Sequence, residues 1–132
     1  MLYKSLAVSI AALLALSLTA CSLGARSPIT VGDADAGKTV ELSQGDTLVV
    51  ALAGNITTGY NWEILPLDPA VLQQVGVPQV TPDSTALGAG GKIALKFQAV
   101  KSGRAKLSLV YRRSWEKDVP PLKTFDITVV VK

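Results

Sequence analysis

The chain has 132 residues, of which 48% are apolar and 17% charged, which suits one packed domain and excludes wholesale disorder. The formal net charge is +3, but lysine and arginine are interleaved with acidic residues, so no basic stripe for a nucleic acid is indicated. There is no histidine and only one cysteine, which excludes Ser-His-Asp and Cys-His catalytic arrangements and most zinc sites. We therefore expect no enzyme, no metal and no cofactor.

The N-terminal part of the chain has the pattern of a secretory leader. Lys4 is followed by an almost entirely apolar stretch over residues 6–15 and by Leu18-Thr19-Ala20 directly before Cys21. A cationic start, a short apolar stretch and small residues before a cut are typical of a signal peptide. The apolar stretch is too short for a comfortable membrane span. We predict a cleaved signal peptide over residues 1–20.

The segment around Cys21 also resembles the bacterial lipobox, in which the cysteine thiol is acylated and becomes the new N-terminus. Several acyl chains anchor a protein stably, whereas one chain binds only marginally. We therefore expect secretion across the inner membrane, an acylated Cys21 and a short tether, together residues 21–28. Ser22 follows the cysteine, which by resemblance to Gram-negative sorting favours an outer-membrane anchor facing the periplasm. An ordinary leader with a chance cysteine is the alternative.

Residues 29–132 are predicted to form the folded domain from short strands. Apolar residues recur at every second position in six stretches, as in strands that bury one face. The inward-facing residues of these stretches are expected to be Val40, Leu42, Leu48, Val50, Leu52, Tyr60, Trp62, Ile64, Ile93, Leu95, Phe97, Ala99, Ala105, Leu107, Leu109, Tyr111, Phe125, Ile127, Val129 and Val131. Seven or eight strands without a long helix predict an all-β, immunoglobulin-like antiparallel β-sandwich.

One segment between these stretches is predicted to be irregular. Residues 68–74 begin with Asp-Pro, which suits one helical turn capped by the aspartate with proline at its first position. Pro78 and Pro82 confine residues 75–80 to an edge strand or an irregular role, because proline cannot donate to a strand ladder.

Two features that could suggest an enzyme are better explained as turns. Asp33 and Asp35 are the best-placed pair of carboxylates, but they lie in a Gly/Ala-rich stretch and are expected in a solvated turn. The run Gly88-Ala89-Gly90-Gly91 precedes a strand instead of following one, which is the wrong order for a dinucleotide-binding loop.

Three loops differ from the remaining connections. They are the first loop (residues 55–60), the second loop (residues 87–91) and the third loop (residues 112–116). In the first loop, Asn55 can bond the loop's own backbone, and Thr57 and Thr58 present hydroxyl groups at the tip. The second loop is rich in glycine, which lets a backbone approach a partner closely. The third loop contains Arg113 and Trp115, residue types that are enriched among interface hot spots.

The aromatic residues near these loops divide into two groups. Tyr60 and Trp62 continue the alternation of a strand and are expected to belong to the core. Trp115 lies beyond the alternation of its strand, among charged residues, and is expected to be exposed or half-exposed.

Together the three loops resemble those of the chagasin-type inhibitors of papain-like cysteine peptidases. That family carries an Asn-Pro-Thr-Thr-Gly-Tyr/Phe loop, a glycine-rich loop and an Arg-Pro-Trp loop, in this order. Here they read Asn55-Ile56-Thr57-Thr58-Gly59-Tyr60, Gly88-Ala89-Gly90-Gly91 and Arg113-Ser114-Trp115, and the resemblance extends over residues 40–132. Ile56 and Ser114 replace the two family prolines. This predicts weaker inhibition or loops held by other contacts.

The resemblance implies a protein that inhibits reversibly by occluding the active-site cleft of a papain-like cysteine peptidase of the host, a prey or the organism itself. The first loop would enter the cleft beside the catalytic cysteine and histidine, with the other two loops on either side. The implied peptidase-binding residues are Asn55, Thr57, Thr58, Gly59, Gly88, Gly90, Gly91, Arg113 and Trp115. We hypothesise that Thr57 and Trp115 contribute most of the binding energy, and we expect a monomer.

Two other functions fit the same fold class, because sandwiches host many activities. One is an envelope lipoprotein that acts as an adhesion or scaffolding module, which has no reason to combine the three loops in this order. The other is a carbohydrate-binding module, which needs a flat row of exposed aromatic side chains. With Tyr60 and Trp62 expected in the core, Trp115 is left alone.

Overall fold

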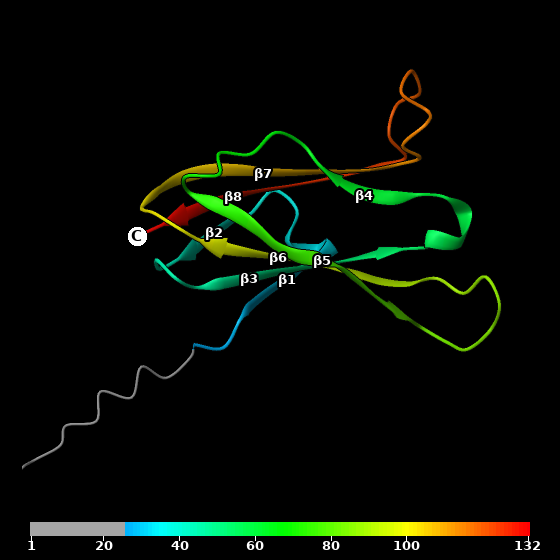
Figure 1. Ribbon diagram of the computed structural model, residues 1–132, viewed down its shortest axis with the longest axis horizontal. Coiled ribbons are helices and arrows are strands. Elements are labelled where there is room, and N and C mark those ends of the chain that lie inside the picture. Colours follow the sequence, from blue (N-terminus) through cyan, green and yellow to red (C-terminus); the bar gives the residue numbers. More distant parts are fainter. Residues whose placement is uncertain (1–25) are drawn as a thin grey trace, which may run out of the picture.

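The computed structural model describes residues 26–132, which form two four-stranded sheets packed against each other (Figure 1). The predicted signal peptide, Cys21 and residues 22–25 of the predicted tether lie outside the described residues. The first sheet has the order β1 (Ile29–Gly32), β3 (Thr47–Gly54), β6 (Gly91–Ala99), β5 (Leu72–Pro82). The second sheet has the order β2 (Thr39–Leu42), β8 (Lys123–Val131), β7 (Gly103–Arg112), β4 (Asn61–Ile64). Two short 3-10 helices are η1 (Asp33–Asp35) and η2 (Ile56–Thr58).

The all-β sandwich is confirmed, but the expectation that it is antiparallel throughout is wrong for two strands. β1 pairs with β3 in parallel, and β2 pairs with β8 in parallel. The four other pairings are antiparallel. Both parallel strands have four residues, and the turn at η1 joins them while the chain passes from the first sheet to the second. This crossing gives both sheets a short parallel strand at one edge.

The core lies between the sheets, where the predicted alternation places it. Among the expected inward positions, those of β3, β6, β7 and β8 are at most 5% exposed. Trp62 is 5% exposed, and Tyr60 and Ile64 are partly buried and pack against the core. Each large apolar side chain that is fully buried contributes roughly 1.5–3 kcal/mol by its removal from water. Packing therefore stabilises the fold.

The edge strand β5 begins earlier than expected. Asp68 does cap a single turn: its Oδ1 accepts from the N–H of Ala70 at 3.0 Å, and its carbonyl oxygen accepts from the N–H of Leu72 at 3.2 Å. The prediction of a helical turn that continues to residue 74 is wrong, because Leu72 is fully buried and residues 72–75 pair with β6. The predicted edge role of the segment that follows is confirmed, with a shift of register between Val75 and Gln79. Such irregularities protect an exposed edge from pairing with other chains.

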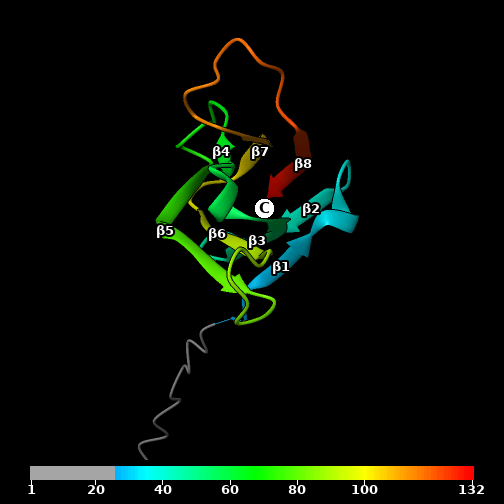
Figure 2. The same cartoon turned by 90° about the vertical axis from the view of Figure 1, so that its right-hand side faces the viewer.

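All three loops project from the same end of the sandwich, at the right in Figure 1. Figure 2 looks onto this end and shows the first loop between the other two. The register explains the arrangement, since β3 ends where β6 begins and β4 begins where β7 ends. β1 begins at the opposite end, toward which the C-terminus also lies (Figure 1). Within residues 26–132, no helix is long and apolar enough to cross a membrane.

Candidate functional site

The first loop is a closed turn organised by Asn55. The side-chain Oδ1 of Asn55 accepts hydrogen bonds from the backbone N–H of Thr57 at 3.1 Å and from its hydroxyl group at 2.6 Å. The hydroxyl group of Thr58 donates to the carbonyl oxygen of Asn55 at 2.6 Å. Gly59 closes the turn with φ +83°, a left-handed conformation that favours glycine. Both threonine hydroxyl groups therefore serve the loop itself, and its exposed tip forms a compact wedge.

Asn55 also joins the first loop to the second. Its Nδ2 donates to the carbonyl oxygen of Gly88 at 2.8 Å. Gly88 adopts φ +75°, which other residue types rarely adopt. The connection between β5 and β6 is closed by a hydrogen bond from the N–H of Asp83 to the carbonyl oxygen of Gly90 at 2.9 Å. The amide of one side chain thus fixes the spacing between the two loops.

Gly91 has a clear packing role. It is the first residue of β6, is buried, and pairs with Gly54 on one side and Pro82 on the other. A Cβ atom at this position would collide with the carbonyl oxygen of Thr81. The close approach of the β5 backbone is sufficient to require glycine here, and a contact of Gly91 with a peptidase stays a prediction.

The third loop is joined to the first by Arg113. Its Nε donates to the carbonyl oxygen of Thr58 at 3.0 Å, and its Nη1 donates to Oε1 of Glu116 at 3.2 Å. The guanidinium carbon lies 4.5 Å from the centre of the Tyr60 ring, a cation–π distance. The guanidinium group is therefore engaged within the protein, and Arg113 acts as a strut between the first and third loops.

Trp115 is the large aromatic side chain that the loop end exposes. It is 67% exposed, as expected from its position beyond the strand pattern. Its indole lies over Gly59, where a Cβ atom would come within 2.5 Å of Cη2. The glycine thus has a second reason to lack a side chain, since it makes room for the indole. Trp115 presents apolar surface next to the tip of the first loop.

The two positions where the resembling family has proline are held by other contacts. Ile56 is the first residue of η2, and the N–H of Gly59 donates to its carbonyl oxygen at 3.1 Å. Ser114 is the second residue of a turn closed by a hydrogen bond from the N–H of Glu116 to the carbonyl oxygen of Arg113 at 3.0 Å. Hydrogen bonds within and between the first and third loops therefore restrict the loop backbone, as proline does in the resembling family.

Comparison with known proteins agrees with the geometry of the loop end. Residues 41–129 match the family described as Chagasin family peptidase inhibitor I42. The chain belongs to the chagasin family. Amoebiasin-1 of Entamoeba histolytica is 31% identical to it over 96 residues, which are 71% of this chain and 90% of that protein. The family comprises peptidase inhibitors and not enzymes.

Solved structures share the fold of this chagasin-family chain. A cysteine protease inhibitor from Entamoeba histolytica superposes with a TM-score of 0.70 at 22% identity, over 79% of this chain and 95% of that one. The inhibitor PbICP-C, solved in complex with falcipain-2, superposes with a TM-score of 0.54 at 21% identity, over 83% of this chain and 96% of that one.

Two surface hollows of the chagasin-family chain differ in character. One, of about 460 Å³, separates the first loop from the connection between β5 and β6. Its rim includes Ile56, which is 48% exposed, and Leu87, which is fully exposed. Together with Trp115, these side chains give the loop end an apolar surface that a partner can cover.

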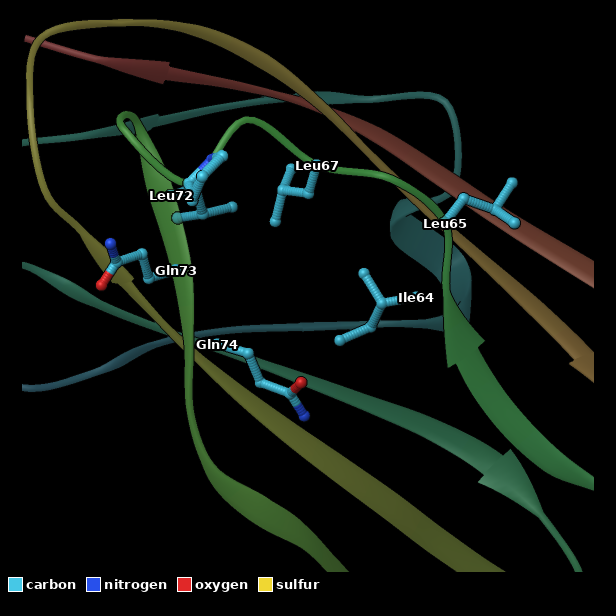
Figure 3. A pocket seen from close by; sticks show the side chains of 7 residues that line it. Ile64, Leu65, Leu67, Leu72, Gln73 and Gln74 are labelled. Carbon is cyan, nitrogen blue, oxygen red and sulfur yellow. The ribbon is translucent and has the colours of Figure 1, made fainter.

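The other hollow, of about 330 Å³, lies on the side of the sandwich between β4 and β5 and shares no lining residue with the three loops. It is lined by Ile64, Leu65, Leu67, Pro69, Leu72, Gln73 and Gln74. Figure 3 shows Ile64, Leu67 and Leu72 pointing toward a common space, whereas Leu65 and Gln73 point away from it. It gathers no charged side chain, so the loop end is the better candidate site.

The turn that was expected at Asp33 and Asp35 is confirmed as η1, and it serves structure. Asp33 accepts from the N–H of Ala53 at 3.1 Å. The backbone N–H of Gly32, followed by the ammonium group of Lys38, lowers the pKa of the Asp35 carboxyl below its ordinary value. Among residues 26–132, no three His, Cys, Asp or Glu side chains gather to hold a metal ion.

Glu116 and Tyr111 both belong to the family resemblance, but the sequence does not show how they organise the site. Glu116 follows Trp115 in the chain, and its contact with Arg113 depends on the geometry of the turn. Tyr111 continues the alternation of β7 and is expected in the core, yet its hydroxyl group also contacts the backbone of Asn55. The one available signal is the residue type, since a buried tyrosine usually finds a partner for its hydroxyl group.

Proposed function

We propose that this chain is a tight-binding, reversible inhibitor of papain-like cysteine peptidases that occludes the active-site cleft with its three loops. The observation that carries the proposal is the joining of the loops at one end of the sandwich. Asn55 bonds the first loop to the second, Arg113 bonds the third to the first, and Trp115 stands exposed beside them. A related fold, PbICP-C, has been solved in complex with falcipain-2, a precedent for binding a peptidase.

The first loop blocks the cleft without serving as a substrate. A peptidase attacks a carbonyl group of an extended peptide, but residues 56–58 form a 3-10 turn whose hydroxyl and amide groups bond Asn55. The tip at Thr57 and Thr58 would enter the cleft beside the catalytic cysteine and histidine. Because the turn is already formed, little conformational entropy is lost on binding. Protease inhibitors typically bury about 800 Å² per partner, which three loops can supply.

The flanking loops have separate tasks in this mechanism. Trp115 supplies exposed apolar area on one side of the first loop, and the backbone around Gly88 and Gly90 approaches the enzyme on the other. Arg113 holds the third loop in place through the carbonyl oxygen of Thr58, so its effect on binding is largely indirect. This division follows from exposure, because the indole is exposed whereas the guanidinium group is engaged.

The proposal includes an N-terminal lipid anchor at Cys21, in the outer membrane and facing the periplasm, on a monomeric protein. β1 runs parallel to β3, which leads to the first loop, so the chain enters the domain at the end away from the loops. An anchor there would leave the loops free to meet a peptidase. Incorporation of labelled palmitate into the parent chain, and its loss in Cys21→Ser, tests the anchor. Equal labelling of both would contradict it.

The function is tested by titration of residues 22–132, which contain all eight strands, against papain and a cathepsin L-like enzyme with a fluorogenic peptide. We expect stoichiometric inhibition that is reversed by dilution, with the inhibitor recovered uncut. No inhibition at micromolar concentration by a chain whose fold is verified by circular dichroism would exclude the proposed function.

A further inference from the structure

Tyr111 is a residue of the core whose hydroxyl group reaches the backbone of the first loop. It is 4% exposed. The backbone N–H of Asn55 donates to the phenol oxygen at 2.7 Å, and the phenol O–H lies 3.4 Å from the carbonyl oxygen of the same residue. One side chain thereby engages both backbone polar groups of Asn55.

The contact lies where the first sheet ends. Pairing of β3 with β6 stops at Gly54, so the backbone of Asn55 is the first beyond the ladder. Tyr111 belongs to the second sheet, and its hydroxyl group therefore ties the exit of β3 to the opposite sheet. Trp62, the register partner of Tyr111, makes a similar tie, since its indole Nε1 donates to the carbonyl oxygen of Ala53 at 3.1 Å.

The ring of Tyr111 is held by its neighbours. Its centroid lies 5.3 Å from that of Tyr60 and 5.1 Å from that of Trp62. The ammonium group of Lys123 lies 5.5 Å from the ring centre, within cation–π range. Aromatic stacking of this kind restricts the ring, so the hydroxyl group is a fixed point beneath the first loop.

Asn55 connects the hydroxyl group of Tyr111 to the tip of the first loop and to the second loop. Its side chain holds Thr57 in the tip and the carbonyl oxygen of Gly88 in the second loop. We propose that Tyr111 is a positioning residue for peptidase inhibition, acting through Asn55 to set the place of the wedge before the enzyme arrives. The proposal rests on the proposed function.

The test removes only the hydroxyl group, by Tyr111→Phe in residues 22–132. We expect the inhibition constant for papain to rise about three- to tenfold, as for the loss of the shorter of the two contacts, the hydrogen bond from the N–H of Asn55. Amide hydrogen exchange of Asn55 and Thr57 in the free protein should become faster, because both amides depend on the position of Asn55.

Ile127→Val is the control for a general loss of stability. It removes one buried methylene group from the middle of β8, where Ile127 pairs with Leu107. Its free energy of unfolding should fall about as much as that of Tyr111→Phe. We expect this variant to inhibit papain as the parent does, because a small change in stability leaves nearly all molecules folded.

Ile56→Pro, added to Tyr111→Phe, restricts the first loop by an independent route. Ile56 opens η2, and its N–H donates no hydrogen bond among the described residues. Asn55 before it is extended, with φ −134° and ψ 100°, close to what a residue before proline requires. The double variant should recover most of the lost inhibition.

Unchanged inhibition by Tyr111→Phe, or a loss that Ile56→Pro does not recover, would overturn the proposal. If the parent chain does not inhibit papain, the proposed function fails instead. Amide exchange of Asn55 in the free protein then decides alone whether the hydroxyl group of Tyr111 fixes the first loop.

Discussion

The body of the sandwich and its loop end are stabilised in different ways. In the body, side chains such as Phe97 and Leu107 are fully buried between the sheets, and apolar area removed from water stabilises the fold. At the loop end, Ile56, Leu87 and Trp115 are exposed, and order comes from a few hydrogen bonds between loops. Substitutions between the sheets should therefore mainly change stability, whereas substitutions at the loop end, and of the Tyr111 hydroxyl group that reaches it, should mainly change inhibition.

The largest effect on stability is expected from Phe97→Ala in β6. Phe97 is fully buried, and its truncation leaves a cavity in the centre of the core. Loss of a buried phenylalanine side chain typically costs about 3–5 kcal/mol, a large part of the stability of a small domain. Urea unfolding measures the change. A decrease in the free energy of unfolding below about 1 kcal/mol would contradict the view that burial between the sheets stabilises the fold.

The largest effect on inhibition is expected from Trp115→Ala. Removal of an exposed aromatic hot spot should raise the inhibition constant about 100-fold, which corresponds to ~3 kcal/mol. The free energy of unfolding should change by less than about 0.5 kcal/mol, because the side chain is 67% exposed. Fluorogenic assays and urea unfolding of the same preparation measure both quantities. A decrease of about 3 kcal/mol in the free energy of unfolding, equal to the loss of binding energy, would show that the indole stabilises the fold instead of binding the peptidase.

A smaller effect, in the opposite direction, is expected from Ser114→Pro. Proline suits the second position of the turn between Arg113 and Glu116 and restricts the free loop. The gain in stability should be about 0.5 kcal/mol, and the inhibition constant should fall about twofold because less order is lost on binding. Weaker inhibition would mean that the hydroxyl group of Ser114 has a role of its own.

The smallest effect is expected from Asp35→Asn in η1. The N–H of Gly32 and the ammonium group of Lys38 lower the pKa of Asp35 in the folded state. A lowered carboxyl pKa contributes stability above the pKa of the unfolded chain, and this contribution is lost as pH falls through the folded pKa. The melting temperature of the parent should therefore approach that of the variant in acid. A difference that is constant between pH 7 and pH 2.5 would contradict this.

The body can be predicted from the sequence because burial of alternate residues is a local property of a strand. β2, β3, β4, β6, β7 and β8 each show it. β5 does not. In β1, Val31 is buried and Ile29 packs against the core, but the parallel pairing of this strand depends on where the chain crosses between sheets. Before β5, Asp68-Pro69 indicates a helical turn, but pairing with β6 replaces the helical conformation from Leu72 onward.

The loop end can be predicted only in part. The three loops are visible as residue types that do not fit a strand, and Trp115 is exposed as expected. The contacts between the loops are not visible, because they join Asn55 to Gly88, 33 positions away, and Arg113 to Thr58, 55 positions away. Distant residues meet only after the sheets have formed. The roles of the individual loop residues in binding stay predictions.

The central claim, that the loop end is the peptidase-binding surface, is tested most directly by hydrogen–deuterium exchange of residues 22–132 alone and with equimolar papain. We predict that papain protects residues 55–60, 87–91 and 112–116 together and leaves the hollow between β4 and β5 unchanged. Absence of protection, or protection at Ile64 and residues 72–74 without the loops, would contradict the claim.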